Sequence, residues 1–109
     1  MNPYIIAKSV IKCCMGLKKN ERFLVVSDQN KLKIANIFLK EAEKITENSA
    51  IIISNPSLEN GQEPNRIIGD AMKLADVSLF VTTKSFSHTD ARRDAVKKGV
   101  RIASMPGIT

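Results

Sequence analysis

The sequence predicts a three-layer α/β/α domain with a parallel sheet of about four strands. Four short apolar runs, over residues 23–26, 50–54, 77–83 and 100–104, have the length and composition of strands buried in a sheet. The segments between them have helical periodicity and are long enough for the crossovers that parallel strands require. With 43% hydrophobic and 26% charged residues in 109, one core is expected. We therefore expect a single α/β domain over residues 1–109.

A first helix is expected over residues 3–17, where apolar side chains recur every three or four positions. Pro3 suits the start of this helix, and Gly16 stands near its end. The only two cysteines, Cys13 and Cys14, are neighbours, so they can neither bridge distant segments nor supply spaced zinc ligands. We expect at least one of them to be buried as a small apolar group.

Two further helices are expected between the strands. Asp28 or Asn30 stands where a short side chain can accept hydrogen bonds from the first amides of the second helix. The third helix is expected to begin near Pro64, after a surface loop over residues 55–62. The residues expected to carry the third helix into the core are Ile67, Ile68, Ala71, Met72 and Ala75.

The fourth helix is short and basic, with apolar residues at Ala91, Ala95 and Val96 and a C-cap at Gly99. The strand orders 2-1-3-4 (flavodoxin-like) and 3-2-1-4 (Rossmann-like) both obey the crossover rule, so both stay open. Only five residues follow the fourth strand, which leaves it without the helix that usually comes next. We expect the chain to be the N-terminal part of a longer protein.

The chain is basic, with a formal net charge of +6, but its 17 lysines and arginines are mostly interleaved with acids. This pattern is typical of a solvated surface, and we do not expect nucleic-acid binding. No apolar run is long enough to span a membrane, and the first residues do not resemble a secretory signal. We expect a cytoplasmic protein without membrane contact.

Candidate contact residues cluster after the strands, because ligands of open parallel sheets bind beyond the carboxyl ends of the strands. The candidates for ligand or interdomain contact are Asp28, Ser85, Ser87, His88, Thr89 and Arg92. Hydroxyls, an arginine and the free amides of a helix N-terminus suit an anion or a carboxylate. The same residues also suit capping of the helix and hydrogen bonds to the backbone. Both interpretations stay open.

Several kinds of catalytic site are not expected in this segment. The loop after the first strand has no glycine, so the dinucleotide fingerprint and the phosphate-binding P-loop are absent. One histidine without a Cys-x-x-Cys pair does not make an ordinary metal site, and no G-x-S-x-G elbow is present. We therefore predict no catalytic residue, no metal ligand and no cofactor within these 109 residues.

Two motifs carry a resemblance to a known family: Ser85-Phe-Ser-His-Thr-Asp-Ala-Arg92 and Met105-Pro-Gly-Ile-Thr109. In order and separation they resemble the N-terminal domain of the aminopeptidase T or thermophilic metalloaminopeptidase family, often labelled leucyl aminopeptidase. The likeness extends over residues 75–109. It implies a dimeric hydrolase acting on peptides, in which a separate C-terminal catalytic domain holds two divalent metal ions. No metal ligand of the family has a matching position here, so the resemblance implies a segment that is inactive alone and pairs with that missing domain.

Two other functions stay open from the residues themselves. The first is a stand-alone module that binds a small anion or a carboxylate through Ser87, His88, Thr89 and Arg92. The second is a basic nucleic-acid-associated domain, whose binding would have to be salt-sensitive.

Overall fold

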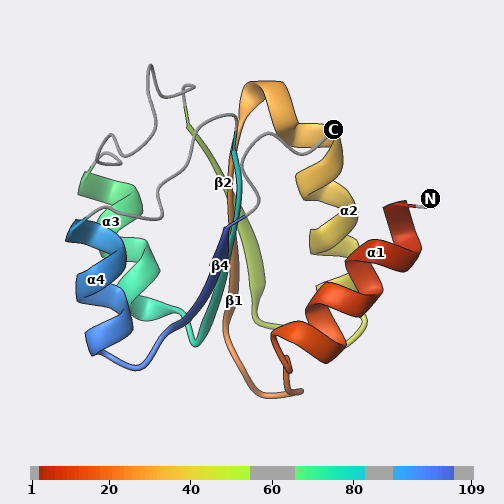
Figure 1. Cartoon of the computed structure of the whole chain (residues 1–109), viewed down its shortest axis with the longest axis horizontal. Coiled ribbons are helices and arrows are strands. Elements are labelled where there is room, and N and C mark those ends of the chain that lie inside the picture. The colour runs from red at the N-terminus through yellow and green to blue at the C-terminus, as the bar shows by residue number, and fades with distance from the viewer. Residues whose placement is uncertain (1–2, 55–65, 83–89, 105–109) are drawn as a thin grey trace.

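The computed structural model describes residues 3–54, 66–82 and 90–104. Four strands form one sheet: β1 (Phe23–Asp28), β2 (Ser49–Ser54), β3 (Val77–Val81) and β4 (Arg101–Ser104). Four α-helices flank it: α1 (Pro3–Ser9), α2 (Leu32–Glu43), α3 (Arg66–Leu74) and α4 (Asp90–Lys97). The pairs α1 with α2 and α3 with α4 cover opposite faces of the sheet (Figure 1).

All three strand pairs are parallel, and the strand order is β2-β1-β3-β4. The predicted three-layer fold is confirmed, and the order is the flavodoxin-like one of the two that the sequence left open. Strands β1 and β3 lie in the middle and are buried along their whole length. The expectation that β2 is equally buried is wrong, because β2 lies at one end of the sheet and is only partly covered.

Each face of the sheet has its own hydrophobic core, since successive side chains of a strand point to opposite faces. Phe23 and Val25 of β1 pack on the side of α1 and α2. Leu24 and Val26 pack on the side of α3 and α4. The continuous apolar runs of the sequence are therefore strands covered on both sides, as parallel sheets require.

The first helix corrects the prediction for the cysteines, because Cys13 and Cys14 are both exposed. After α1 the chain widens into a π-helical turn, η1 (Val10–Cys14), in which the Met15 amide donates to the Val10 carbonyl at 2.9 Å. The wider turn places Ala7, Ile11 and Met15 inward at intervals of four, and this spacing leaves both cysteines outside. Gly16 then ends the helix at a positive φ of 61°.

One more core prediction is corrected on the opposite face of the sheet. Ile68 and Met72 of α3 are buried as predicted, but Ile67 is 75% exposed. Val96 of α4 is 50% exposed, whereas Ala95 is buried. Neighbouring helical positions lie about 100° apart, so only one of two adjacent apolar residues can face the sheet. Gly99 adopts a positive φ of 95°, which confirms the expected C-cap.

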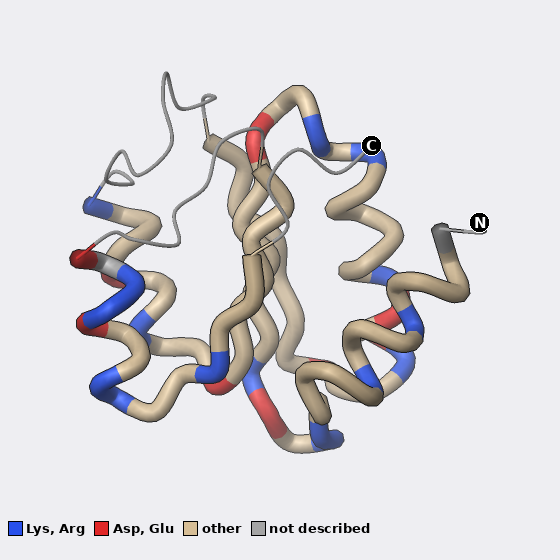
Figure 2. Tube along the Cα trace, in the orientation of Figure 1, with Lys and Arg blue, Asp and Glu red and all other residues tan. Residues whose placement is uncertain are grey.

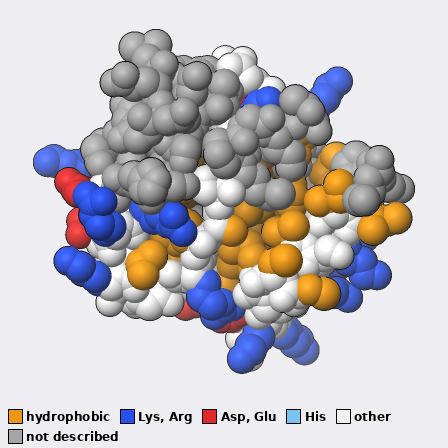
Figure 3. Space-filling model, in the orientation of Figure 1, with side chains coloured by type: hydrophobic (Ala, Val, Ile, Leu, Met, Phe, Trp, Pro, Cys, Tyr) orange, Lys and Arg blue, Asp and Glu red, His pale blue; other side chains and the backbone are white. Residues whose placement is uncertain are grey.

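The basic residues are spread over all four α-helices, the turns and the start of β4 rather than gathered in one patch (Figure 2). On the face nearest the viewer, hydrophobic side chains gather between β4 and α1 (Figure 3). No helix in the described ranges is long and apolar enough to cross a membrane. The cytoplasmic location and the absence of nucleic-acid binding stay predictions.

Candidate functional site

Polar residues gather at the carboxyl ends of the two central strands. Ser27 and Asp28 end β1, and Thr82 follows β3; all three are at most 2% exposed. The crossover from β1 runs over one face through α2, and the crossover from β3 runs over the other through α4. The position between β1 and β3 is therefore the topological switch point, where ligands of open α/β sheets bind.

Asp28, one of the predicted contact residues, also has a structural role. Its Oδ1 accepts a hydrogen bond from the Lys31 amide at 3.2 Å and caps the short 3-10 helix η2 (Gln29–Lys31) that leads into α2. The Ser27 hydroxyl donates to the Asp28 carbonyl at 3.0 Å. The predicted N-cap is confirmed at Asp28, and this bond holds the carboxylate at the sheet edge.

Arg92 is half-buried in the first turns of α4, and its Nη2 donates to the carbonyl of Ile102 in β4 at 3.4 Å. Strand β3 lies between this residue and Asp28, since Asp28 ends β1. This hydrogen bond from Arg92 joins α4 to β4. The other four candidates, Ser85, Ser87, His88 and Thr89, lie outside the described residues, so their contact role stays a prediction.

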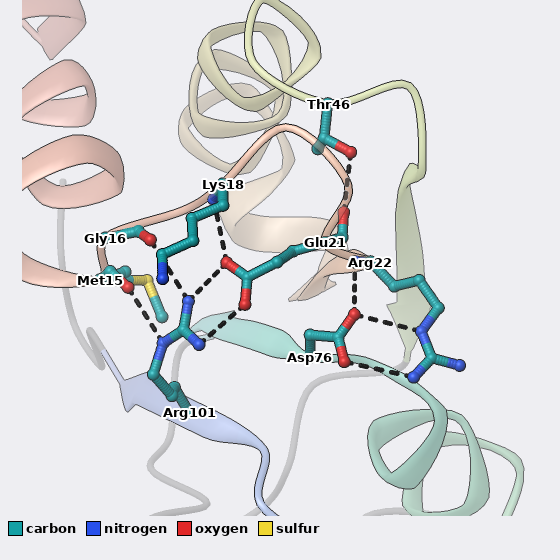
Figure 4. Close-up of polar contacts among 8 residues, drawn as sticks. All are labelled: Met15, Gly16, Lys18, Glu21, Arg22, Thr46, Asp76 and Arg101. Atoms are coloured by element: carbon teal, nitrogen blue, oxygen red, sulfur yellow. Dashed lines mark hydrogen bonds and ion pairs between the residues drawn. The ribbon is translucent and has the colours of Figure 1, made fainter.

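The opposite, amino edge of the sheet carries two ion pairs that the sequence did not indicate (Figure 4). Arg101 Nη1 and Nη2 donate to Glu21 Oε2 and Oε1 at 2.8 and 2.6 Å. Arg22 Nη2 donates to Asp76 Oδ1, and Arg22 Nε to Asp76 Oδ2, both at 3.2 Å. The hydrogen bonds from Arg101 lower the pKa of Glu21, and those from Arg22 lower the pKa of Asp76.

These pairs join distant parts of the chain. Arg101 also donates to the carbonyl of Met15 at 3.2 Å and to that of Gly16 at 3.3 Å, so it ties β4 to the end of the first helix. Arg22 and Asp76 are 54 residues apart in the sequence, and Glu21 and Arg101 are 80 residues apart. No local sequence pattern therefore reveals either pair. One signal was available: a charged residue stands directly before β1 and β3 and begins β4, and parallel strands begin at the same edge.

The described part of the chain has several open hollows, and one of them, lined by residues 29–34 and 36, lies directly after Asp28 at the carboxyl end of β1. Another, of about 260 Å³, lies between α1 and α2 and is lined by Tyr4, Ile5, Lys8, Lys12, Glu41, Lys44 and Ile45. Glu41 in its wall is buried and pairs with Lys44 at 3.0 Å. The described residues hold no cluster of three His, Cys, Asp or Glu side chains suited to a metal ion.

The fold and its polar edge define an α/β domain of the open parallel-sheet class. No family model and no curated protein matches this chain. A solved structure of 2,5-dihydroxypyridine dioxygenase from Pseudomonas putida KT2440 is similar, with a TM-score of 0.75 and 13% sequence identity. The match covers 95% of this chain but 33% of the dioxygenase chain. At this identity the likeness shows the fold alone, and the chain spans about a third of the length of the structure it matches.

The comparisons overturn the predicted aminopeptidase T family and, with it, the predicted hydrolase and metalloprotease function. No family model matches, and a solved structure with this fold is that of a dioxygenase. The prediction was wrong because it depended on two short motifs beside strand ends. Loops at strand ends vary independently of the sheet beneath them, and one α/β fold carries many unrelated chemistries.

Proposed function

We propose that this chain is an α/β domain that completes a binding site together with a second domain, through the carboxyl edge of its sheet. The observation that carries the proposal is the burial of Ser27, Asp28 and Thr82 at the switch point between β1 and β3. Burying polar groups costs free energy, so a fold that places several of them at one edge normally uses that edge.

Two further observations support the proposal. The charged groups at the amino edge are already engaged with one another and with backbone carbonyls, which leaves the carboxyl edge as the better place for a ligand. The fold also occurs as about a third of a longer enzyme chain, where other segments accompany it. In this proposal the second domain supplies the reactive groups, and the present chain supplies a rigid polar wall.

The first experiment asks whether the chain performs chemistry alone. Oxygen uptake is measured with 2,5-dihydroxypyridine, with and without added divalent metal ions. We expect uptake no faster than in a control without protein. Sustained, protein-dependent turnover would show that the 109 residues hold a complete catalytic site and would refute the shared-site proposal.

The second experiment locates the binding edge by amide chemical-shift mapping with acetate, inorganic phosphate and 2,5-dihydroxypyridine as probes. We expect the largest shifts at Ser27, Asp28 and Thr82. Asp28→Asn keeps an N-cap but removes the charge, so it should change the response, whereas Asp70→Asn on the exposed surface of α3 should not. Shifts concentrated at the amino edge or between α1 and α2, or no response to any probe, would contradict the proposed edge.

A further inference from the structure

One edge of the outer strand β2 pairs with no other described strand. Its six residues, Ser-Ala-Ile-Ile-Ile-Ser, include no charged residue, no proline and no glycine. Edge strands in soluble proteins usually carry lysine, proline or a bulge that prevents pairing with another chain. Ile53 is 46% exposed, and three consecutive β-branched residues favour strand pairing. The edge of β2 is therefore suited to accept another strand.

Helix α3 adds an apolar stripe beside this edge. Ile67, Ala71 and Leu74 recur at intervals of four and three, so they share one flank of the helix. Ile67 is 75% and Leu74 67% exposed, so no other described element covers this flank. The opposite flank of α3 contacts α4, and α4 packs on β4. The stripe consequently faces the β2 end of the sheet.

Helix α2 adds a second apolar flank beside β2, on the other face of the sheet. Its flank toward α1 carries Glu41, which lies in the wall of the hollow between the two helices. Leu32 and Leu39 are on the other flank, toward the β2 end, and Leu32 is also exposed. Ile53 of β2 points to this face, since it aligns with Ser27 in the register. An apolar surface thus continues across all three layers of the domain.

We call this surface the β2 face and define it by its members: Leu32, Leu39, Ala50, Ile53, Ile67, Ala71 and Leu74. In Figure 1, where colour fades with distance, β4, α1 and α4 are nearer to the viewer, and β2, α2 and α3 lie behind them. The view is down the shortest axis, so the β2 face is one of the two broad sides of the domain. The domain measures 31 × 30 Å across that view. The rectangle of these extents, roughly 900 Å², is an upper bound on the area of the β2 face, and it leaves room for the roughly 800 Å² per partner of a standard interface.

The opposite broad side is less suited to self-association. Its strand β4 begins with Arg101, and Arg93 and Lys97 of α4 line a hollow beside it with Val96. Figure 3 shows arginine and lysine side chains around the hydrophobic area on this side. Arg101 and Arg93 pair with Glu21 and Asp90, so a two-fold contact there would have to bury these ion pairs. Strand β2 has no charged residue, and the charge nearest the apolar flank of α2 is Glu43, four residues after Leu39, so two copies meet mainly through apolar groups.

We infer that the β2 face binds a second copy of this chain, with the two β2 strands antiparallel in one continuous eight-stranded sheet. A two-fold axis perpendicular to the sheet leaves α2 of both copies on one face of the joined sheet and α3 of both copies on the other face. The apolar stripe of α3 therefore meets the same stripe of the partner copy. An axis through Ile52 places Ile53 of one copy opposite Ile51 of the other, on the same face. The contact buries the exposed isoleucines and pairs the open backbone edge.

The oligomeric state tests this inference by sedimentation velocity in reducing buffer, which excludes disulfides through the exposed Cys13 and Cys14. At about 100 μM, where an interface of standard size should be occupied, we expect twice the 12.0 kDa mass of one chain. Leu74→Lys should raise the dissociation constant at least tenfold, because it places like charges at the two-fold contact. The matched control Val96→Lys, on an exposed site of the other broad side, should leave the dimer intact. A monomeric wild type, or a dimer that Val96→Lys disrupts and Leu74→Lys does not, would overturn the inference.

A cross-link tests the strand pairing itself. In a background with Cys13→Ser and Cys14→Ser, Ile52→Cys places one thiol beside its two-fold copy, and Ser49→Cys does not. We expect mild oxidation to link Ile52→Cys chains into dimers much faster than Ser49→Cys chains. Equal rates for the two variants would contradict an axis through Ile52. Circular dichroism of each variant verifies that the domain is folded.

Discussion

The ion pair between Arg101 and Glu21 gives the most direct test of what holds the amino edge together. Arg101 makes two hydrogen bonds to the Glu21 carboxylate, at 2.6 and 2.8 Å, and two more to the carbonyls of Met15 and Gly16. We predict that Arg101→Met, which retains the aliphatic stem, destabilises the domain more than the loss of the ion pair alone. The variant leaves two carbonyls and a carboxylate without this partner.

The magnitude follows from exposure and geometry. Ion pairs at protein surfaces contribute about 0.2–1 kcal/mol, and two parallel hydrogen bonds place this pair at the upper end of that range. The Glu21 side chain is 19% exposed and that of Arg101 44%, so solvent screens the pair only in part. With the two carbonyl bonds added, we expect Arg101→Met to cost about 2 kcal/mol in total, of which about 1 kcal/mol is the coupling to Glu21.

The assay is a double-mutant cycle of Arg101→Met, Glu21→Gln and the double variant, with the free energy of unfolding measured in urea at pH 7 and at low pH. Because Arg101 lowers the pKa of Glu21, the stabilisation is fully present above the pKa of an unfolded glutamate, about 4.3. It is lost as the pH falls through the lower pKa of the folded state. The coupling should therefore vanish once the pH lies below the pKa of Glu21 in the folded state. In thermal unfolding, 2 kcal/mol corresponds to a fall of roughly 10 °C in Tm for a domain of this size.

Two results would refute this reasoning. A coupling energy below about 0.3 kcal/mol at pH 7 would mean that the pair is screened like an ordinary surface contact. A coupling that persists at low pH would mean that Glu21 acts through packing and not through its charge. Arg22→Met provides a comparison, since its pair with Asp76 has longer hydrogen bonds and more exposed side chains and should show a smaller coupling.

Three further predictions concern single side chains. Asp28→Ala should lower the free energy of unfolding by about 1 kcal/mol through loss of the cap, and Asp28→Asn should largely retain it, as measured by urea denaturation. Thr46→Val should cost about 1–2 kcal/mol because its hydroxyl donates to the Glu21 carbonyl at 2.7 Å; Thr46→Ser should restore most of this, and equal losses would contradict the assignment. Ser78→Ala should raise the free energy of unfolding by about 1 kcal/mol, since the buried Ser78 hydroxyl has no hydrogen-bond partner among the described residues, and a clear loss of stability would point to a partner.

The local pattern of the sequence was sufficient for the fold class. Continuous apolar runs such as 23–26 predict strands buried on both faces, and the structure confirms this for the two central strands. The caps at Asp28 and Gly99 were also predictable, because each depends on one residue and the amides or carbonyls next to it. Element type is a local property, so a local reading of the chain finds it.

The sequence was less informative wherever two adjacent residues were both apolar. The sequence is equally compatible with burial of either residue of Cys13–Cys14, of Ile67–Ile68 and of Ala95–Val96. The choice depends on the rotation of the helix against the sheet, and in the first helix on a π-helical turn that changes this rotation. The short motifs near residues 85–92 and 105–109 predicted a family that the comparisons do not support.

The sequence by itself determined that the chain forms a parallel α/β layer structure, because apolar periodicity sets which segments become strands and helices. Only the tertiary structure decided the strand order, and with it which strand lies at an open edge and where the switch point falls. It also decided that Glu21 meets Arg101 across 80 residues. Both depend on how distant segments pair in space, and the free energy of that pairing belongs to no single stretch of the chain.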